Sequence, residues 1–187
     1  DQRARNAALP GSFVSPGDWR KCQKVSRFPP RLIKQTMAVL TPVSMPYADT
    51  KPVGHADFYF AVNATFRFIQ RHHGEGALRK YWQDIGQSYY QPVSKRWSEL
   101  GFAGVAEYWR AFFAAEPGAE VEVSEAQDEV RLEVKTCPAI HHLREHGREI
   151  VPNFCQHCFF VNEAIAEPAG MTVRVCGGNG RCTQRFM

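Results

Sequence analysis

Residues 120–136, EVEVSEAQDEVRLEVKT, alternate apolar and charged side chains on both sides of Gln127 and Asp128. A period of two places successive side chains on opposite faces of a strand, and a polar turn between two such runs is typical of a β-hairpin. A second pair of runs, MTVRVC and RCTQRF, surrounds the GGNG turn at residues 177–180. Glycine allows the positive φ angles of tight turns. The sequence therefore predicts one small antiparallel sheet.

The residues before this sheet follow a helical period. Apolar residues recur at spacings of three and four in residues 55–74, and Gly74 is expected to end that helix. A second helical stretch is expected in residues 76–101, with a break at Pro92, and a third in residues 102–118. These helices should cover one face of the sheet. The predicted fold is α+β, with a helical half packed on a small antiparallel sheet.

Residues 1–52 contain seven of the twelve prolines. Because proline removes amide donors and interrupts helices, this segment is predicted to be an extended N-terminal arm with one short helix, RLIKQTMAVL. Residues 53–187 are then a single α+β domain. Ordering the arm costs about 1–2 kcal/mol per residue, so it should lie on its own domain or on another subunit. We expect a homo-oligomer, or a partner subunit contacted by the arm.

Composition excludes several function classes. The formal net charge is +4, and the basic residues are spread along the 187 residues without a block, which argues against a nucleic-acid partner. No apolar run approaches the roughly 20 residues that cross a bilayer, so no membrane association is expected. Six cysteines would permit disulfides, but a chain with 44% hydrophobic residues does not need them. A reduced, cytoplasmic protein is expected.

Five of the six cysteines and four of the seven histidines follow residue 135. Thiolates attack carbon and bind soft or borderline metals, so this clustering predicts a functional site. The C-x-x-C motif at Cys155 and Cys158 has three interpretations. A thiolate at a helix N-terminus would be a nucleophile of lowered pKa. The pair could instead bind a metal ion, or the thiols could be small buried apolar groups.

A metal site would need further ligands around the C-x-x-C motif. The ion would be zinc or iron, and tetrahedral zinc takes four ligands. The candidate ligands are Cys137, Cys155, Cys158, Cys182 and His157.

The order of these segments resembles a known family. The chain has helices followed by VRLEVKTCP, FCQHCFFVNEAIA and a closing RCTQRF. This order is similar to that of the L-2-amino-thiazoline-4-carboxylate hydrolase family and of the related 4-vinyl reductase-type small-molecule-binding domain. The resemblance covers about residues 55–187. It is carried by Cys137-Pro138, Cys155, Cys182 with Phe186, and the spacing of Cys176, Gly180 and Cys182. The hydrolase pattern has an acidic residue three positions after its second cysteine, where this chain has Cys158.

The resemblance implies a hydrolase that acts on a C–N or C=N bond of a small cyclic substrate. Cys155, or else Cys137, would attack an amidine-like carbon, and His73 or His142 would transfer the proton. His73 could alternatively be a cation at a helix C-terminus, and His142 could be solvated with His146.

The substrate would lie against aromatic side chains that otherwise belong to the core. The candidates are Tyr108, Phe112 and Phe159. We expect Cys137, Cys155 and Cys158 to lie close together, beside a cavity lined by aromatics of the helical half. The alternative function is a small-molecule- or metal-binding subunit of a larger complex, in which the C-terminal cysteines hold the ion.

Overall fold

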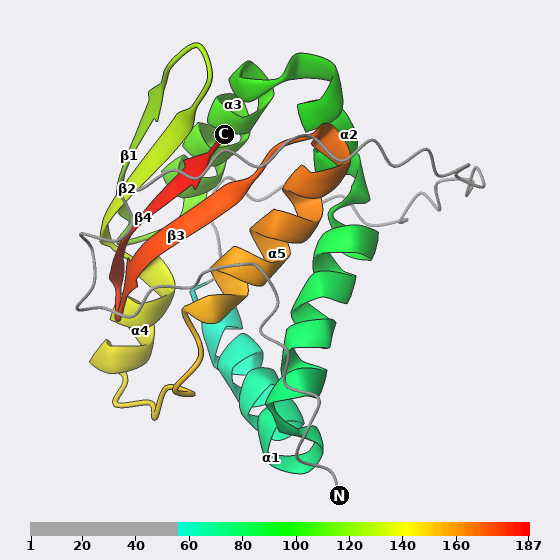
Figure 1. Cartoon of the computed structure of the whole chain (residues 1–187). Coiled ribbons are helices and arrows are strands. Elements are labelled where there is room, and N and C mark those ends of the chain that lie inside the picture. Colours follow the sequence, from blue (N-terminus) through cyan, green and yellow to red (C-terminus); the bar gives the residue numbers. More distant parts are fainter. Residues whose placement is uncertain (1–55) are drawn as a thin grey trace, which may run out of the picture.

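A computed structural model describes residues 56–187 of the protein. These residues form an antiparallel sheet of four strands with helices packed against it, so the predicted α+β class is confirmed (Figure 1). The predicted arm at residues 1–52, and the oligomer inferred from it, lie outside the described residues. Within the described part, no helix is both long and apolar enough to cross a membrane.

Helix α1 (Phe58–Asp84) is broken at Gly74, which has φ 83°. The two halves run in opposite directions on either side of this residue (Figure 1). They pack on each other through Phe66 and Trp82, whose rings meet edge to face with 5.3 Å between centroids. The predicted end of the first helix at Gly74 is confirmed.

Three short elements follow α1. The π-helix η2 (Ile85–Tyr89) leads into α2 (Gln91–Leu100), and α3 (Phe102–Ala115) follows after a turn at Gly101. Pro92 lies in the first turn of α2, where its missing amide leaves no helical hydrogen bond unmade. The break in the second helical stretch therefore comes at Tyr90, two residues before the predicted one.

The sheet has the order β1-β2-β4-β3, and every pairing is antiparallel. Its strands are β1 (Glu120–Glu125), β2 (Val130–Thr136), β3 (Val173–Gly178) and β4 (Arg181–Phe186). Alternate residues face the helices, and Val130, Leu132 and Phe186 are fully buried there. The two predicted hairpins and their joining into one sheet are confirmed.

Helices α4 (Pro138–Glu145) and α5 (Gln156–Ala166) come from the segment between β2 and β3. Helix α5 runs beside β3, with α1 and η2 against its other side, and the 3-10 turn η3 (Glu167–Ala169) ends it (Figure 1). Helix α4 lies at the end of the sheet where the β3–β4 turn is found. The N-terminus of α5 therefore points toward this turn.

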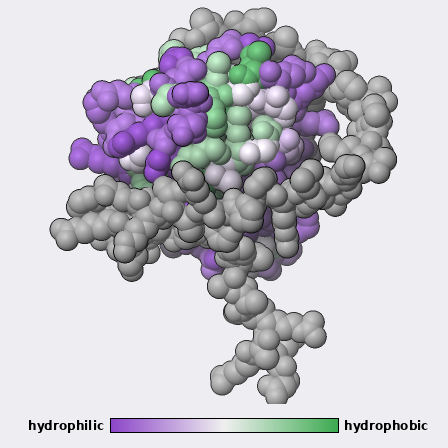
Figure 2. Space-filling view, turned by 45° about the horizontal axis from the view of Figure 1, so that its top comes forward, coloured by the Kyte–Doolittle hydropathy of each residue, from purple (hydrophilic) through white to green (hydrophobic). Residues whose placement is uncertain are grey.

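Two groups of buried side chains hold the domain together. One, around Trp97 and Phe186, lies between the helices and the sheet, and the other, around Leu78 and Trp82, lies between α1 and α4. On the surface, Figure 2 shows apolar residues gathered in a band between hydrophilic regions. Phe159 is buried in the first group, and Tyr108 and Phe112 pack against it.

Candidate functional site

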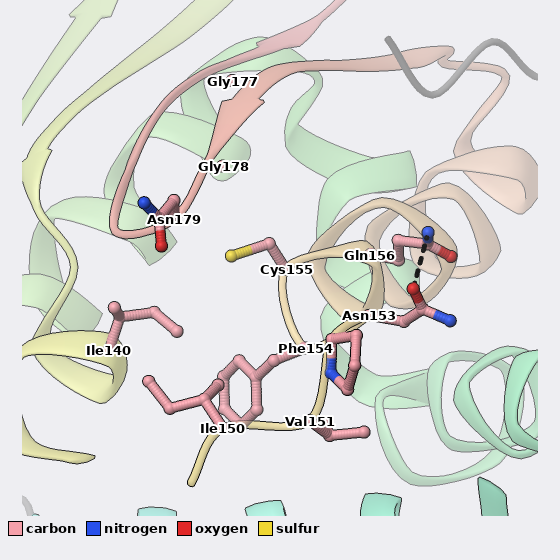
Figure 3. Close-up of a pocket in the computed structure, with 11 residues that line it drawn as sticks. Ile140, Ile150, Val151, Asn153, Phe154, Cys155, Gln156, Gly177, Gly178 and Asn179 are labelled. Atoms are coloured by element: carbon pink, nitrogen blue, oxygen red, sulfur yellow. Dashed lines mark hydrogen bonds between the residues drawn. The ribbon is translucent and has the colours of Figure 1, made fainter. Parts of the chain in front are cut away.

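A pocket of about 330 Å³ lies between the N-terminus of α5 and the β3–β4 turn. Cys155 is the residue before the first turn of α5, and its sulfur points toward the turn that carries Asn179 (Figure 3). The apolar wall comes from Ile140 and Ile150, with Val151 and Phe154 beside them. No residue of α1, α2 or α3 lines this pocket, so the expected aromatic lining from Tyr108 and Phe112 is not found in it.

Opposing effects act on the thiol of Cys155. Burial raises its pKa most, and the neighbouring Cys158 raises it further. The backbone N–H groups of Gly180 and Asn179 and the guanidinium of Arg144 act in the other direction. The net pKa lies above that of an ordinary thiol, so Cys155 is protonated at neutral pH. The predicted lowering of its pKa by a helix N-terminus is outweighed by burial.

The β3–β4 turn presents its amides to Cys155 because its backbone is left-handed. Asn179 has φ 57° and Gly180 has φ 95°. Successive N–H groups in such a conformation can face one point and favour negative charge there. The Arg144 side chain donates to Asn179 Oδ1 and ties the turn to α4. A Cβ at Gly180 would lie 3.1 Å from Ile140 Cγ2, which leaves little room for a side chain.

Four cysteines of the described residues are free thiols: Cys137, Cys155, Cys158 and Cys182. Cys158 interacts electrostatically with each of the other three. Cys137, Cys155 and Cys158 are therefore in electrostatic range of one another, but only Cys155 lines the pocket. Cys176 is disulfide-bonded, so the expectation of a fully reduced chain is wrong at this residue. It faces the opposite side of the sheet from Cys182, since it pairs with Thr183.

Burial dominates the ionisation of the other three thiols. It raises the pKa of Cys137 to about 12, although the amides of Ile140 and Ala139 oppose this at the start of α4. It raises the pKa of Cys158 to about 11. Burial also raises the pKa of Cys182 well above its usual range. All three are therefore protonated at neutral pH.

His157 lies beside Cys158 on α5. Its Nδ1 donates to the carbonyl oxygen of Phe154 at 2.6 Å, because a carbonyl can only accept. Burial lowers the pKa of His157, so the ring is neutral and its Nε2 carries a lone pair. That nitrogen lies 3.7 Å from the sulfur of Cys158.

Three polar residues near the thiols were not predicted from the sequence. Tyr59 Oη donates to Glu116 Oε2 at 2.6 Å and interacts electrostatically with Cys137 and Cys158. Asn162 and Gln184 are buried and hydrogen-bonded to each other beside Cys158 and Cys182. A signal for Gln184 existed, because alternation in RCTQRF places it on the same inward face as Phe186.

The two histidines expected to transfer protons lie away from the pocket lining. His73 is exposed at the bend of α1, where its ring is 6.1 Å from that of Phe68. His142 stacks on Phe60 with 4.8 Å between centroids, and its Nε2 is 3.1 Å from Asp57 Oδ1. Neither residue is brought to Cys155 in this arrangement.

A metal site would require the thiols and His157 to surround one centre. In residues 56–187, no group of three or more His, Cys, Asp or Glu side chains is arranged to hold a metal ion. Zinc bound by thiolates requires ligands about 2.3 Å from one centre. The candidate ligands therefore do not fit zinc or iron without rearrangement.

Comparison with models of known protein families and with curated proteins found no match to this chain.

Proposed function

We propose that this protein is a cysteine-dependent hydrolase of a C–N or C=N bond in a small cyclic substrate, as the resemblance to the L-2-amino-thiazoline-4-carboxylate hydrolases implies. The observation that carries the proposal is the position of Cys155. Among the free thiols of residues 56–187, Cys155 alone lines the pocket. It also lies at the N-terminus of α5 and faces the amides of Asn179 and Gly180.

The size and the lining of the pocket support a small cyclic substrate. A volume of about 330 Å³ is at the small end of ligand sites, which range over roughly 300–1,000 Å³. Ile140, Ile150 and Phe154 offer an apolar surface to a ring. Asn153 and Gln156 also line the pocket, and Nε2 of Gln156 donates to Oδ1 of Asn153 at 3.4 Å (Figure 3).

The protonated state of Cys155 fits addition to a C=N bond. The sulfur forms a bond to the amidine-like carbon, and the thiol proton moves to the nitrogen of that bond. The ring C–N bond then breaks as its nitrogen takes a proton from the other nitrogen of the adduct, which restores a C=N bond at the same carbon. Water adds across this new C=N bond. The S–C bond finally breaks as the added hydroxyl becomes a carbonyl and returns its proton to the sulfur, which restores the thiol. The amides of Asn179 and Gly180 stabilise negative charge on the sulfur as it loses its proton.

The test is hydrolysis of cyclic amidines, beginning with 2-amino-thiazoline-4-carboxylate, by the full chain. Ring opening adds one water molecule to the mass of the substrate. We expect Cys155→Ala to abolish turnover, since the bond-forming atom is lost. The control is Cys182→Ala, which removes a thiol that does not line the pocket. Full activity of Cys155→Ala would refute the proposal.

A second candidate is a metal-binding subunit of a larger complex. The observation that favours it is that four thiols are free and that Cys158 lies in electrostatic range of the other three. An ion would have to draw these thiols together, because residues 56–187 contain no group already arranged to hold one. Metal analysis of the purified chain separates the two candidates. Stoichiometric zinc or iron that is lost in Cys158→Ala would favour the subunit. A metal-free chain whose Cys155 reacts with an alkylating reagent favours the hydrolase.

A further inference from the structure

Asn162 on α5 and Gln184 on β4 form a hydrogen-bonded pair inside the domain. Asn162 is 3% exposed and Gln184 is 4% exposed. Nδ2 of Asn162 donates to Oε1 of Gln184 at 2.9 Å. Their neighbours in the helix–sheet interface, such as Ile165 and Phe186, are apolar. A buried amide pair costs desolvation that a pair of apolar side chains would not, so its presence needs an explanation.

The bond to Asn162 fixes the orientation of the Gln184 amide. Because Oε1 accepts from Asn162, the NH₂ group faces the other way, toward sulfur. Its Nε2 lies 3.7 Å from the sulfur of Cys182. The same side chain donates to the thiol of Cys158, where it lowers the pKa against the larger effect of burial. One side chain of β4 thus contacts α5 at two successive turns.

The spacing along α5 connects this pair to the pocket. Residues seven apart lie on one face of a helix, two turns and about 10 Å from each other. Asn162 is seven residues after Cys155, so both face the β3–β4 hairpin. Asn162 meets Gln184 in the strand, and Cys155 meets the amides of Asn179 and Gly180 in the turn. A shift of α5 along the hairpin would alter both contacts together.

We propose that Asn162 and Gln184 are positioning residues, which fix α5 along the β3–β4 hairpin and so hold Cys155 against the turn amides. The proposal rests on the proposed role of Cys155 as the reacting thiol. Apolar contacts alone tolerate small sliding of a helix on a sheet, whereas a hydrogen bond between two buried amides has a defined distance and angle. The pair therefore specifies geometry at Cys155 rather than net stability.

The test compares stability with the reactivity of Cys155. Each single variant, Asn162→Leu or Gln184→Met, leaves one buried amide unpaired and should lower the urea concentration at the midpoint of unfolding. The double variant removes both polar groups and should recover most of that loss. In the double variant, the rate at which iodoacetamide alkylates Cys155 should nevertheless stay several-fold below the rate in the protein without substitutions. Mass spectrometry of the peptide that contains Cys155 measures this rate.

Two comparisons make the outcome decisive. Ile165→Val, on the same helix and 1% exposed, loosens the interface without touching the amide pair, and it should leave the Cys155 rate unchanged. If the double variant does not fold, Asn162→Leu is compared with Ile165→Val in its place. A rate that recovers with stability, or falls equally in Ile165→Val, would overturn the proposal. Because alkylation needs no substrate, a failure of the hydrolase assay would be recognised separately.

Discussion

The carbonyl oxygen of Gly180 accepts a hydrogen bond from the backbone N–H of Cys137, with 2.9 Å between nitrogen and oxygen. The N–H of the same residue, Gly180, faces the thiol of Cys155. One residue of the β3–β4 turn thus contacts both the Cys-Pro segment before α4 and the first residue of the C-x-x-C motif. This relation explains how two segments separated along the chain reach one site.

Replacement of Gly180 by alanine should disturb both contacts. Its φ of 95° is unfavourable for an L-residue, and a Cβ would press on Ile140 Cγ2 at 3.1 Å. We expect a loss of roughly 1–3 kcal/mol in the free energy of unfolding and slower alkylation of Cys155. Gly170→Ala is the matched control, since Gly170 also has positive φ but has open space around its Cβ position. Equal effects of the two variants on Cys155 would contradict the prediction.

Gly86 should be required where η2 approaches α5. A Cβ there would lie 2.6 Å from both the Cβ of Ala164 and the carbonyl oxygen of Val161. Gly86→Ala should therefore lower the free energy of unfolding by about 1–3 kcal/mol, as overpacking does. Gly76→Ala, in a helix with no atom near the new Cβ, should instead raise it by about 0.5–1 kcal/mol. Urea denaturation of both variants measures these two changes in the free energy of unfolding, which should have opposite signs.

Asn63 on α1 should stabilise the loop that forms one wall of the pocket. Its Nδ2 donates to the carbonyl oxygen of Glu149 at 2.9 Å, and its Oδ1 accepts from the N–H of Val151 at 3.0 Å. Asn63→Ala leaves the N–H of Val151 unpaired and removes one of the two donors to the Glu149 carbonyl, so we expect a loss of roughly 1–3 kcal/mol. Arg67→Ala removes an exposed bond to the same carbonyl and should cost less than about 1 kcal/mol. Thermal or urea unfolding would reveal the difference.

The buried thiols should make the protein less stable in alkaline solution. Burial raises the pKa of Cys137 to about 12 and of Cys158 to about 11, above the roughly 8.5 of an unfolded thiol. Protonated thiols therefore favour the folded state below pH ~8.5, and this contribution is lost as the pH rises toward the folded values. Between about pH 7 and 10.5, the unfolding midpoint should fall with rising pH less steeply in Cys158→Ala than in the protein without substitutions. Equal slopes would show that Cys158 does not contribute.

The sheet was predictable because its alternation is local and complete. In VRLEVKT every second residue faces the core, so residues 130–136 specify both the strand and its buried face. The turn around Asn179 was predictable as a turn, since three glycines surround it.

The polar partners of the thiols were harder to predict. Asn162 in α5 meets Gln184 in β4 only through tertiary packing, and no periodicity in either segment identifies the other. The net pKa of Cys155 likewise depends on burial, which a helix N-terminus in the sequence does not reveal. Tyr59 and Glu116 lie far apart in the chain and meet because the first half of α1 approaches the end of α3.

The bend of α1 at Gly74 has a consequence for the order of folding. Phe66 and Trp82 belong to one helical hairpin, so they can meet after a short loop closes. The pairing of Val134 with Cys182 instead requires the whole segment that contains α4 and α5 to be enclosed, and loops of that length close more slowly. The helical hairpin should therefore be ready as a docking surface early, and the thiols should come together among the last events. A chain that is still maturing would then expose its cysteines to oxidants while most of its helices are already formed.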